Sequence, residues 1–154
     1  MADKKDFLGK GIKFPPQINP ATGRFVTVSE EESVKQSIYL ILMTQRSERP
    51  LRPNFGSNIM SYTFMDQNAG TLGMMSRTIK EQISVQEPRV TNVQVSLESG
   101  YQRGVLLFNI DYTVISTNSR NNFVFPFYLN VTPDENSEGE PEIYEPEIVE
   151  ETGD

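Results

Sequence analysis

Two glutamates, Glu48 and Glu87, are the side chains in this sequence whose type best suits a chemical reaction. A pair of carboxyl groups can cleave a glycosidic bond, one protonating the leaving oxygen while the other acts as nucleophile or base. The arginines beside them in the sequence are Arg46, Arg49, Arg52 and Arg89. A neighbouring positive charge lowers the pKa of a carboxyl group, whereas a general acid needs a raised pKa. The sequence therefore favours arginine-paired glutamates over an acid catalyst.

The composition removes most other kinds of reactive site. The chain contains no cysteine and no histidine. It therefore has no thiol nucleophile, no thiolate ligand and no imidazole to serve as a base or metal ligand near neutral pH. It also shows no glycine-rich phosphate loop, Ser-His-Asp arrangement or cluster of metal-binding residues. We expect a protein that is not an enzyme and that binds no cofactor or metal.

The same arginines, glutamates and prolines fit a rigid junction. One segment runs from Thr44 to Gly56, and a second, Glu87-Pro88-Arg89, follows the next helical pattern. Prolines fix the backbone, and the planar guanidinium of arginine binds carboxylates or backbone carbonyls through two hydrogen bonds. We predict a charge-paired corner, with the pairing left open between the two segments and another chain. Its candidate interaction residues are Arg46, Glu48, Arg49, Arg52, Pro53, Phe55, Gly56, Glu87, Pro88 and Arg89.

Charge is distributed unevenly along the chain. All 14 Lys and Arg lie before residue 132 together with 11 of the 21 Asp and Glu, which gives this part a net charge of +3. The other 10 acids lie between Asp134 and Asp154, where no basic residue occurs. A mildly basic body whose arginines mostly have acids nearby does not indicate a nucleic-acid partner. No apolar run is long enough to cross a bilayer and no signal peptide is evident, so we expect no membrane partner and a protein that folds in the cytoplasm.

Hydrophobic periodicity predicts an α+β fold in one small domain. Ser29 to Glu32 matches a capping box, and an apolar stripe follows it in a helix that ends near Gln45, ahead of Pro50. A weaker helical pattern follows Ser57, and a second main helix ends before Pro88. We predict that these helices pack on a short, mostly antiparallel sheet. The expected organisation is an arm with a first strand in 1–28, the domain in 29–131 and a tail in 132–154.

The strands of the predicted sheet are marked by apolar residues at alternate positions. They fall at 93–97, 106–114 and 123–131, with a polar loop at 116–122. Pro126 cannot donate a hydrogen bond to a strand ladder, which predicts that the last strand lies at an edge. Such an edge is either blunted or able to receive a strand from a partner. We assign Phe123, Phe125 and Phe127 to that contact and expect Phe125→Asp to abolish it without unfolding the domain.

The two ends of the chain differ in character. The N-terminal arm is rich in Lys, Gly and Pro, and Leu8 and Phe14 are apolar enough to dock it on a surface. The acidic tail has few core-building residues, which predicts that it is disordered on its own. It contains a near-repeat, Pro141-Glu-Ile-Tyr-Glu followed by Pro146-Glu-Ile-Val-Glu. A solvated acidic extension is the favoured interpretation, and a docking segment for a basic neighbour is the alternative.

An ordered set of motifs between residues 8 and 131 resembles a known family. They are Gly9-Lys-Gly-Ile-Lys-Phe14-Pro15, Ser37-Ile38 through Thr44, Arg46-Ser-Glu48-Arg49, Pro53-Asn-Phe55-Gly56 and Glu87-Pro88-Arg89-Val90. The sequence resembles the baseplate wedge and sheath-initiator family of contractile phage tails, with relatives in type VI secretion and extracellular contractile injection systems. The resemblance implies a small domain with helices against a short sheet. The acidic tail has no counterpart in the family pattern.

The resemblance also implies a structural role in a phage virion or injection particle. Such proteins sit in several symmetric copies in the inner ring of the baseplate. The Glu87-Pro88-Arg89 segment is expected to contact the helical core bundle of the wedge, and the last strand to receive sheath protein by strand exchange. Tail tube or hub proteins are further expected neighbours. Two alternatives stay open: a lysozyme-like glycosidase acting on peptidoglycan, and a regulatory adaptor with the same fold.

Overall fold

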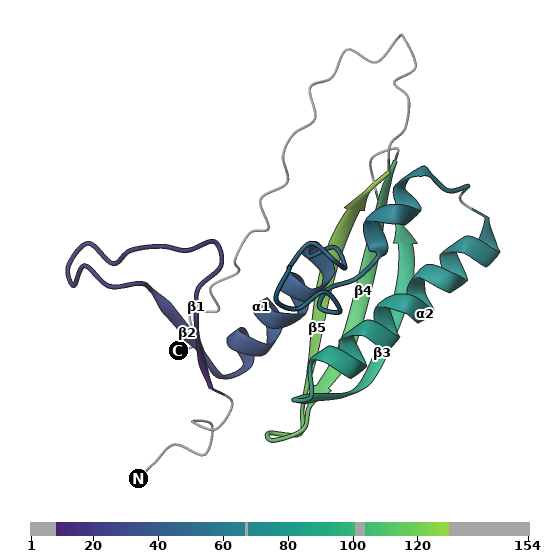
Figure 1. The fold of residues 1–154 in the computed structure, drawn as a ribbon. Coiled ribbons are helices and arrows are strands. Elements are labelled where there is room, and N and C mark those ends of the chain that lie inside the picture. Colours follow the sequence, from purple (N-terminus) through teal and green to yellow (C-terminus); the bar gives the residue numbers. More distant parts are fainter. Residues whose placement is uncertain (1–8, 67, 101–103, 130–154) are drawn as a thin grey trace.

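The fold has two layers, an antiparallel sheet and a layer of helices that covers one face of it (Figure 1). The computed structural model describes residues 9–66, 68–100 and 104–129. In chain order the elements are β1 (Lys10–Ile12), β2 (Thr27–Ser29), α1 (Glu30–Met43), the 3-10 helix η2 (Ile59–Phe64), α2 (Ala69–Gln86), β3 (Val90–Ser99), β4 (Val105–Val114) and β5 (Ser119–Tyr128). The predicted α+β class is confirmed.

The N-terminal arm is a β-hairpin that reaches away from the sheet (Figure 1). β1 pairs antiparallel with β2, and the hairpin turns where the Gly23 N–H donates to the Asn19 carbonyl over 2.8 Å. The arm rests on α1 through Phe14, as predicted: its N–H donates to the side chain of Gln36 over 3.0 Å, and its ring centroid lies 5.9 Å from that of Tyr39. Leu8 lies outside the described residues.

The first helix begins where predicted but without the predicted capping box. Ser29 occupies the N-cap position and its side chain makes no capping hydrogen bond. Ser29 is also the last residue of β2, where it pairs with Lys10, and the Glu32 carboxylate accepts from Gln36 instead. The helix ends at Met43, where the Thr44 N–H donates to the Leu40 carbonyl over 3.0 Å. Its predicted apolar stripe is fully buried and consists of Val34, Ile38, Ile41 and Leu42.

The second main helix lies beside the first on the same face of the sheet (Figure 1). It starts earlier than its apolar stripe, because Asn68 caps it: the side-chain oxygen accepts from the Thr71 N–H over 2.8 Å. Met75, Ile79 and Ile83 face the core and are buried. No helix among the described residues is both long enough and apolar enough to span a bilayer.

The sheet has the strand order β3-β4-β5, so β5 lies at an edge, as Pro126 predicted. The core face carries alternate residues of each strand, and no described helix or strand covers the other face. β3 contains a bulge between Thr91 and Gln94, where Asn92 has a positive φ of 52°. This bulge allows Val93 to reach the core although the pairing shifts by one residue.

β5 starts four residues before the predicted strand, because polar residues continue the pairing beyond the apolar core. Arg120 pairs with Thr113 and Asn122 with Asp111 in the region predicted to be a loop. On the core side, the Ser119 hydroxyl donates to the Glu31 carboxylate over 2.6 Å, and the Thr117 hydroxyl contacts the same oxygen. A carboxylate on α1 therefore satisfies polar groups that apolar alternation does not detect.

Candidate assembly surfaces

The turn between α2 and β3 holds the most deeply buried charge pair of the described residues. Glu87 ends α2, and its N–H still donates to the Ile83 carbonyl over 2.9 Å. Pro88 then turns the chain so that Arg89 folds back on Glu87. The Nε and Nη2 atoms of Arg89 each donate to one carboxylate oxygen of Glu87 over 2.6 Å. The side chain of Glu87 is 3% exposed and that of Arg89 is 29% exposed.

This pair is anchored to the first helix. Burial raises the pKa of the Glu87 carboxyl, but hydrogen bonds from Arg89 and Ser37 and the charge of Arg89 outweigh it, so the pKa lies below its ordinary value. The hydrogen bond to Glu87 in turn raises the pKa of Arg89. Arg89 also reaches the Ser33 hydroxyl over 3.4 Å. Because Ser33 and Ser37 belong to α1, the pair ties the corner to that helix.

A neutral contact, rather than a charged one, connects this corner to the segment that follows α1. The Gly56 N–H donates to the side-chain oxygen of Gln86 over 2.7 Å, and the Gln86 amide donates to the Gly56 carbonyl over 2.8 Å. Gly56 has a φ of 102°, and a Cβ there would lie 2.2 Å from the Thr44 carbonyl oxygen. Only glycine fits this close approach. The two segments of the predicted corner therefore lie next to each other, but Gln86 joins them in place of the predicted charge pair.

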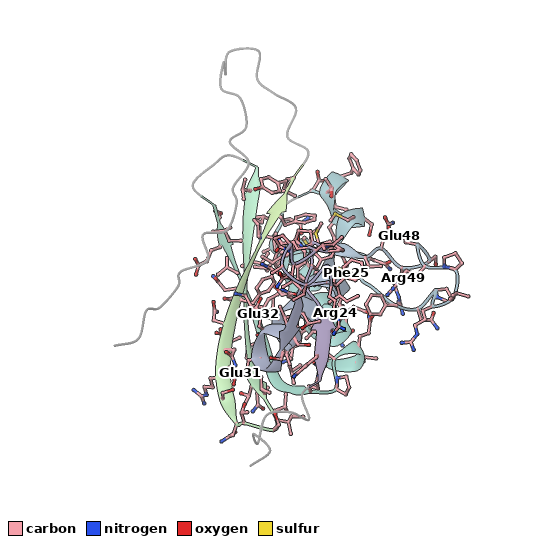
Figure 2. The ribbon with its side chains drawn as sticks, turned by 90° about the vertical axis from the view of Figure 1, so that its left-hand side faces the viewer. Arg24, Phe25, Glu31, Glu32, Glu48 and Arg49 are labelled. Carbon is pink, nitrogen blue, oxygen red and sulfur yellow. The ribbon has the colours of Figure 1, made fainter. Side chains whose placement is uncertain are left out.

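We call Thr44–Gly56 the arginine loop. Its base is closed by the Ser57 N–H, which donates to the Thr44 carbonyl over 2.8 Å. Within it, the Ser47 N–H donates to the Pro53 carbonyl over 2.8 Å. Figure 2 shows the loop projecting from the helical layer on the side away from the sheet, with Glu48 and Arg49 on it. The loop therefore projects into solvent and is held in shape by backbone hydrogen bonds.

The charges of the arginine loop differ from the prediction. Glu48 pairs with no arginine of the described chain: its carboxylate accepts from the Gln45 N–H over 2.9 Å. The turn explains this, because the Glu48 N–H donates to the Gln45 carbonyl and brings the side chain back over that residue. The Arg49 guanidinium lies 4.9 Å from the centre of the Phe55 ring. No acid among the described residues forms an ion pair with Arg46, Arg49 or Arg52.

The phenylalanines assigned to the last strand face the core instead of a partner. Phe125 and Phe127 are each 2% exposed. Phe123 packs edge-on against Tyr39 of α1 with 6.3 Å between ring centroids. The expectation that Phe125→Asp spares the fold is therefore wrong, because it would bury a charge without a partner. Any contact made by this edge has to use its backbone.

The backbone of β5 offers a regular outer edge with one gap. The Leu129 N–H donates to the Gly104 carbonyl over 2.7 Å, and the register pairs Leu106 with Phe127. Odd-numbered residues of β5 therefore bond to β4, and even-numbered residues direct their N–H and C=O groups outwards. Outward N–H groups belong to Arg120, Asn122, Val124 and Tyr128. Pro126 occupies the next outward position and has no N–H, so the uninterrupted run is 119–125.

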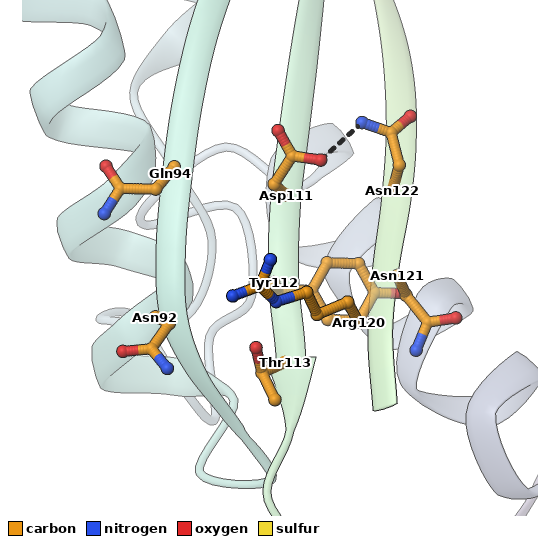
Figure 3. Close-up of a pocket in the computed structure, with 8 residues that line it drawn as sticks. All are labelled: Asn92, Gln94, Asp111, Tyr112, Thr113, Arg120, Asn121 and Asn122. Atoms are coloured by element: carbon orange, nitrogen blue, oxygen red, sulfur yellow. Dashed lines mark hydrogen bonds between the residues drawn. The ribbon is translucent and has the colours of Figure 1, made fainter. Parts of the chain in front are cut away.

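A shallow polar hollow of about 560 Å³ lies on the uncovered face of the sheet (Figure 3). Its lining includes Asn92 and Gln94 from β3, and Asp111 accepts there from the Asn122 amide over 2.9 Å. No group of three or more acids, histidines or cysteines in the described part of the chain could hold a metal ion. The hollow has the character of a surface depression.

Fold and surfaces together define a small two-layer domain whose distinctive features are an edge strand, a braced arginine loop and a docked arm. Residues 28–119 match the family model described as baseplate wedge protein gp25, and the chain belongs to this family. The resemblance found in the sequence is thereby confirmed. Baseplate wedge protein gp25 of Enterobacteria phage T4 is 28% identical over 83 residues, which are 54% of this chain and 63% of that protein. The match thus spans less than two thirds of the T4 protein.

Solved structures share the fold. A Geobacter sulfurreducens protein whose name refers to a tail lysozyme is 40% identical, with a TM-score of 0.62 over 71% of this chain and all of that one. A chain of the anti-feeding prophage baseplate is 23% identical, with a TM-score of 0.60 over 83% of this chain and 91% of that one. A chain of the type VI secretion baseplate complex is 17% identical, with a TM-score of 0.54 over 65% of this chain and 93% of that one.

Proposed function

We propose that this protein is a structural baseplate component of a contractile tail or injection system, which joins the wedge and starts sheath assembly. Family membership is the observation that carries the proposal. It is supported by two features with no catalytic use, the outer edge of β5 and the arginine loop. Several copies would form a symmetric ring, assembled in the bacterial cytoplasm, with tube or hub proteins as further neighbours.

The sheath contact is proposed at the outer edge of β5. An extended segment of a sheath subunit would add a strand to the sheet, because outward N–H and C=O groups recur at every second residue. Pro126 breaks this pattern, so the contact is proposed at 119–125. β5 itself is fixed beneath by buried Phe125 and Phe127, so the template is rigid before the partner arrives.

The wedge contact is proposed at the arginine loop and the adjoining Glu87-Pro88-Arg89 corner. The last carbonyls of helices carry partial negative charge, and guanidinium groups bind such carbonyls well. Arg46 and Arg52 are exposed and form no ion pair with a described residue. Glu87 and Arg89 instead satisfy each other, so their proposed part is to hold the corner in shape while the loop makes contact.

A lysozyme activity is the second candidate, because the Geobacter sulfurreducens relative bears such a name. The two candidate glutamates do not support it. The lowered pKa of Glu87 is the opposite of what a general acid needs, and Glu48 accepts a backbone N–H. We expect no release of fragments from purified peptidoglycan by the pure protein. Turnover that is lost in both Glu48→Gln and Glu87→Gln would establish the enzyme and overturn the structural assignment.

The proposal is tested by removing one outward N–H from β5. Val124→Pro deletes a donor that faces the partner and leaves the bonds to β4 intact, whereas Val124→Ala shortens the same side chain and keeps the donor. Each variant replaces the wild type in the producing cells, and particles are imaged by electron microscopy. We expect baseplates without sheath for Val124→Pro and complete particles for Val124→Ala. Urea unfolding of both purified variants confirms that each still folds.

The outcome separates the backbone edge from other contacts. Complete sheaths on Val124→Pro particles would show that β5 does not template the sheath. A similar loss in Val124→Ala would show that the side chain, on the uncovered face, makes the contact instead of the backbone.

A further inference from the structure

We propose that the arginine loop binds the acidic tail of the same chain, through the near-repeat at residues 141–150. The proposal goes beyond the baseplate role and does not depend on it, because it concerns the isolated protein, in which no wedge protein occupies the loop. The tail itself lies outside the described residues. The argument starts from the loop, whose geometry is known.

The arginine loop carries three arginines close in sequence to an exposed apolar side chain. Leu51, at its tip, is 97% exposed. Arg49 is held over Phe55, while Gly56 is held by Gln86, so the loop keeps its shape without a ligand. Leu51 therefore contributes nothing to the core. An acidic partner with apolar side chains could contact both this leucine and the arginines around it.

The tail has the reciprocal pattern. Each half of its repeat places an apolar pair between acids, as Glu-Ile-Tyr-Glu and Glu-Ile-Val-Glu, whereas the loop reads Arg49-Pro-Leu-Arg52. The segment from residue 132 carries 10 acids and no basic residue. A surface ion pair contributes little by itself, so several pairs and the apolar contact have to act together. The resulting attraction should weaken with salt.

The tail is long enough to reach the loop of its own chain. Eleven residues, 130–140, separate the end of the described strand region from the repeat, and at about 3.5 Å each they span up to about 38 Å. A domain of this size has a radius of gyration of about 13 Å, hence a diameter of about 35 Å. A short tether also gives an effective concentration on the order of millimolar, which favours the same chain over a second copy.

The arm carries a second group of basic side chains to which the acidic tail could bind. Lys10 and Arg24 are exposed there too, Lys13 is half-buried, and none of the three forms an ion pair with a described residue. They are distributed over a longer hairpin than the arginines of the loop. Reversing three charges in either place changes the net charge equally. The arm therefore serves as a matched control.

The experiment uses the full chain with a nitroxide spin label in the tail. Because the sequence contains no cysteine, Thr152→Cys provides a single attachment point two residues after the repeat. Paramagnetic broadening of backbone amide signals is measured by NMR in the isotope-labelled protein. We expect signals of residues 46–56 to broaden selectively at low salt, and the effect to be lost at 0.5 M NaCl, where the screening length is about 4 Å.

Charge-reversal variants locate the contact. Arg46→Glu with Arg49→Glu and Arg52→Glu should abolish the broadening of the loop, while Lys10→Glu with Lys13→Glu and Arg24→Glu should leave it unchanged. Retention of the amide spectrum outside the loop shows that the first variant is folded. Uniform broadening, or broadening of the arm, would overturn the proposal.

A mixed sample distinguishes one chain from two. Isotope-labelled protein without the spin label is combined with unlabelled protein that carries it, so only contacts between molecules are detected. We expect no broadening of the loop in this sample. Broadening there equal to that in the single-species sample would replace the proposal with binding by the tail of a second copy.

Discussion

The corner at Glu87-Pro88-Arg89 and the arginine loop are built from the same residue types but differ in their burial and in how their charges are paired. At the corner, a buried carboxylate holds its arginine by two hydrogen bonds of 2.6 Å. In the loop, the glutamate binds a backbone N–H, and the arginines form no ion pair with a described residue. The charges of the corner are paired with each other inside the fold, whereas the arginines of the loop are available to a ligand.

The difference lies in burial and in what the neighbouring helix supplies. Ser33 and Ser37 of α1 provide polar partners beside Glu87 and Arg89, so the pair can be buried with its hydrogen bonds satisfied. The arginine loop projects into solvent, where an ion pair gains little over hydration. Motifs rich in arginine, glutamate and proline thus do not define a role until their burial is known. Mutations should separate the two regions by the size of their effects on stability.

The largest effect is expected where the loop meets the corner. Gly56→Ala should lower the free energy of unfolding by about 3 kcal/mol or more, because the strained φ adds to a clash with the Thr44 carbonyl. Urea unfolding measures the change. Gly23→Ala is the control, since Gly23 also has a positive φ but no neighbour within 4 Å; it should cost about 1 kcal/mol. Equal costs would show that the close approach to Thr44 is not rigid.

Glu87→Ala should cost about 2–3 kcal/mol, because it deletes hydrogen bonds to a charged group and leaves a half-buried guanidinium without its carboxylate. Glu81→Ala is the control: Glu81 also pairs with an arginine, Arg77, but on the exposed face of α2. That variant should stay within about 0.5 kcal/mol of wild type. A similar cost for both would remove the distinction between buried and exposed pairs.

The same carboxylate should make stability depend on pH. The folded pKa of Glu87 is lowered, so its stabilising effect is complete above the unfolded value of 4.5 and is lost as pH falls through the folded value. The difference in unfolding free energy between wild type and Glu87→Gln should therefore be constant from pH 7 to about 5 and shrink below pH 4.5. Urea titrations between pH 7 and pH 3 measure it. A constant difference down to pH 3 would contradict the lowered pKa.

Gln86→Ala should cost roughly 1–2 kcal/mol, the sum of two neutral hydrogen bonds to Gly56. Gln94→Ala, on the uncovered face of the sheet, is the matched change and should stay within about 0.5 kcal/mol of wild type. Hydrogen exchange at the Gly56 amide should quicken in the first variant alone. Unchanged exchange would mean that Gln86 does not brace the loop.

The smallest effect is expected in the loop itself. Arg52→Ala should change the free energy of unfolding by no more than about 0.5 kcal/mol, since its side chain has no partner among the described residues. Arg89→Ala is the same change at the corner and should cost several times more. Thermal or urea unfolding of the two variants side by side makes the comparison. A large cost for Arg52→Ala would give the loop arginines a structural role.

The fold was predictable wherever the signal was local and periodic. Val34, Ile38 and Leu42 follow one another at helical spacing, and their burial depends on that spacing alone. Pro126 located the edge strand because one missing N–H has the same consequence in any sheet. The capping box is absent: Ser29 ends β2 and precedes α1 without a side-chain cap, and the Glu32 carboxylate accepts from Gln36.

The site was less predictable because its contacts join residues distant in sequence. Gln86 bonds to Gly56 across 30 positions, and a single glutamine before Glu87 gives no motif from which to infer this. Glu48 shows a second limit of prediction from sequence, since a carboxylate in a turn can accept a hydrogen bond from a backbone N–H although arginines are nearby. The phenylalanines of β5 were assigned to a partner contact, but they lie on the face that the helices cover and are buried in the core.

The bulge in β3 has a consequence for how the domain adds to a larger structure. Asn92 and Val93 interrupt the regular spacing of backbone groups at that edge, and such irregular edges discourage strand pairing. β5 has no such irregularity before Pro126. The two edges of the sheet therefore differ: the β5 edge is regular up to Pro126, whereas the bulge interrupts the β3 edge between Thr91 and Gln94. Under the proposed function, a strand from the sheath would thus be added next to β5 and not next to β3.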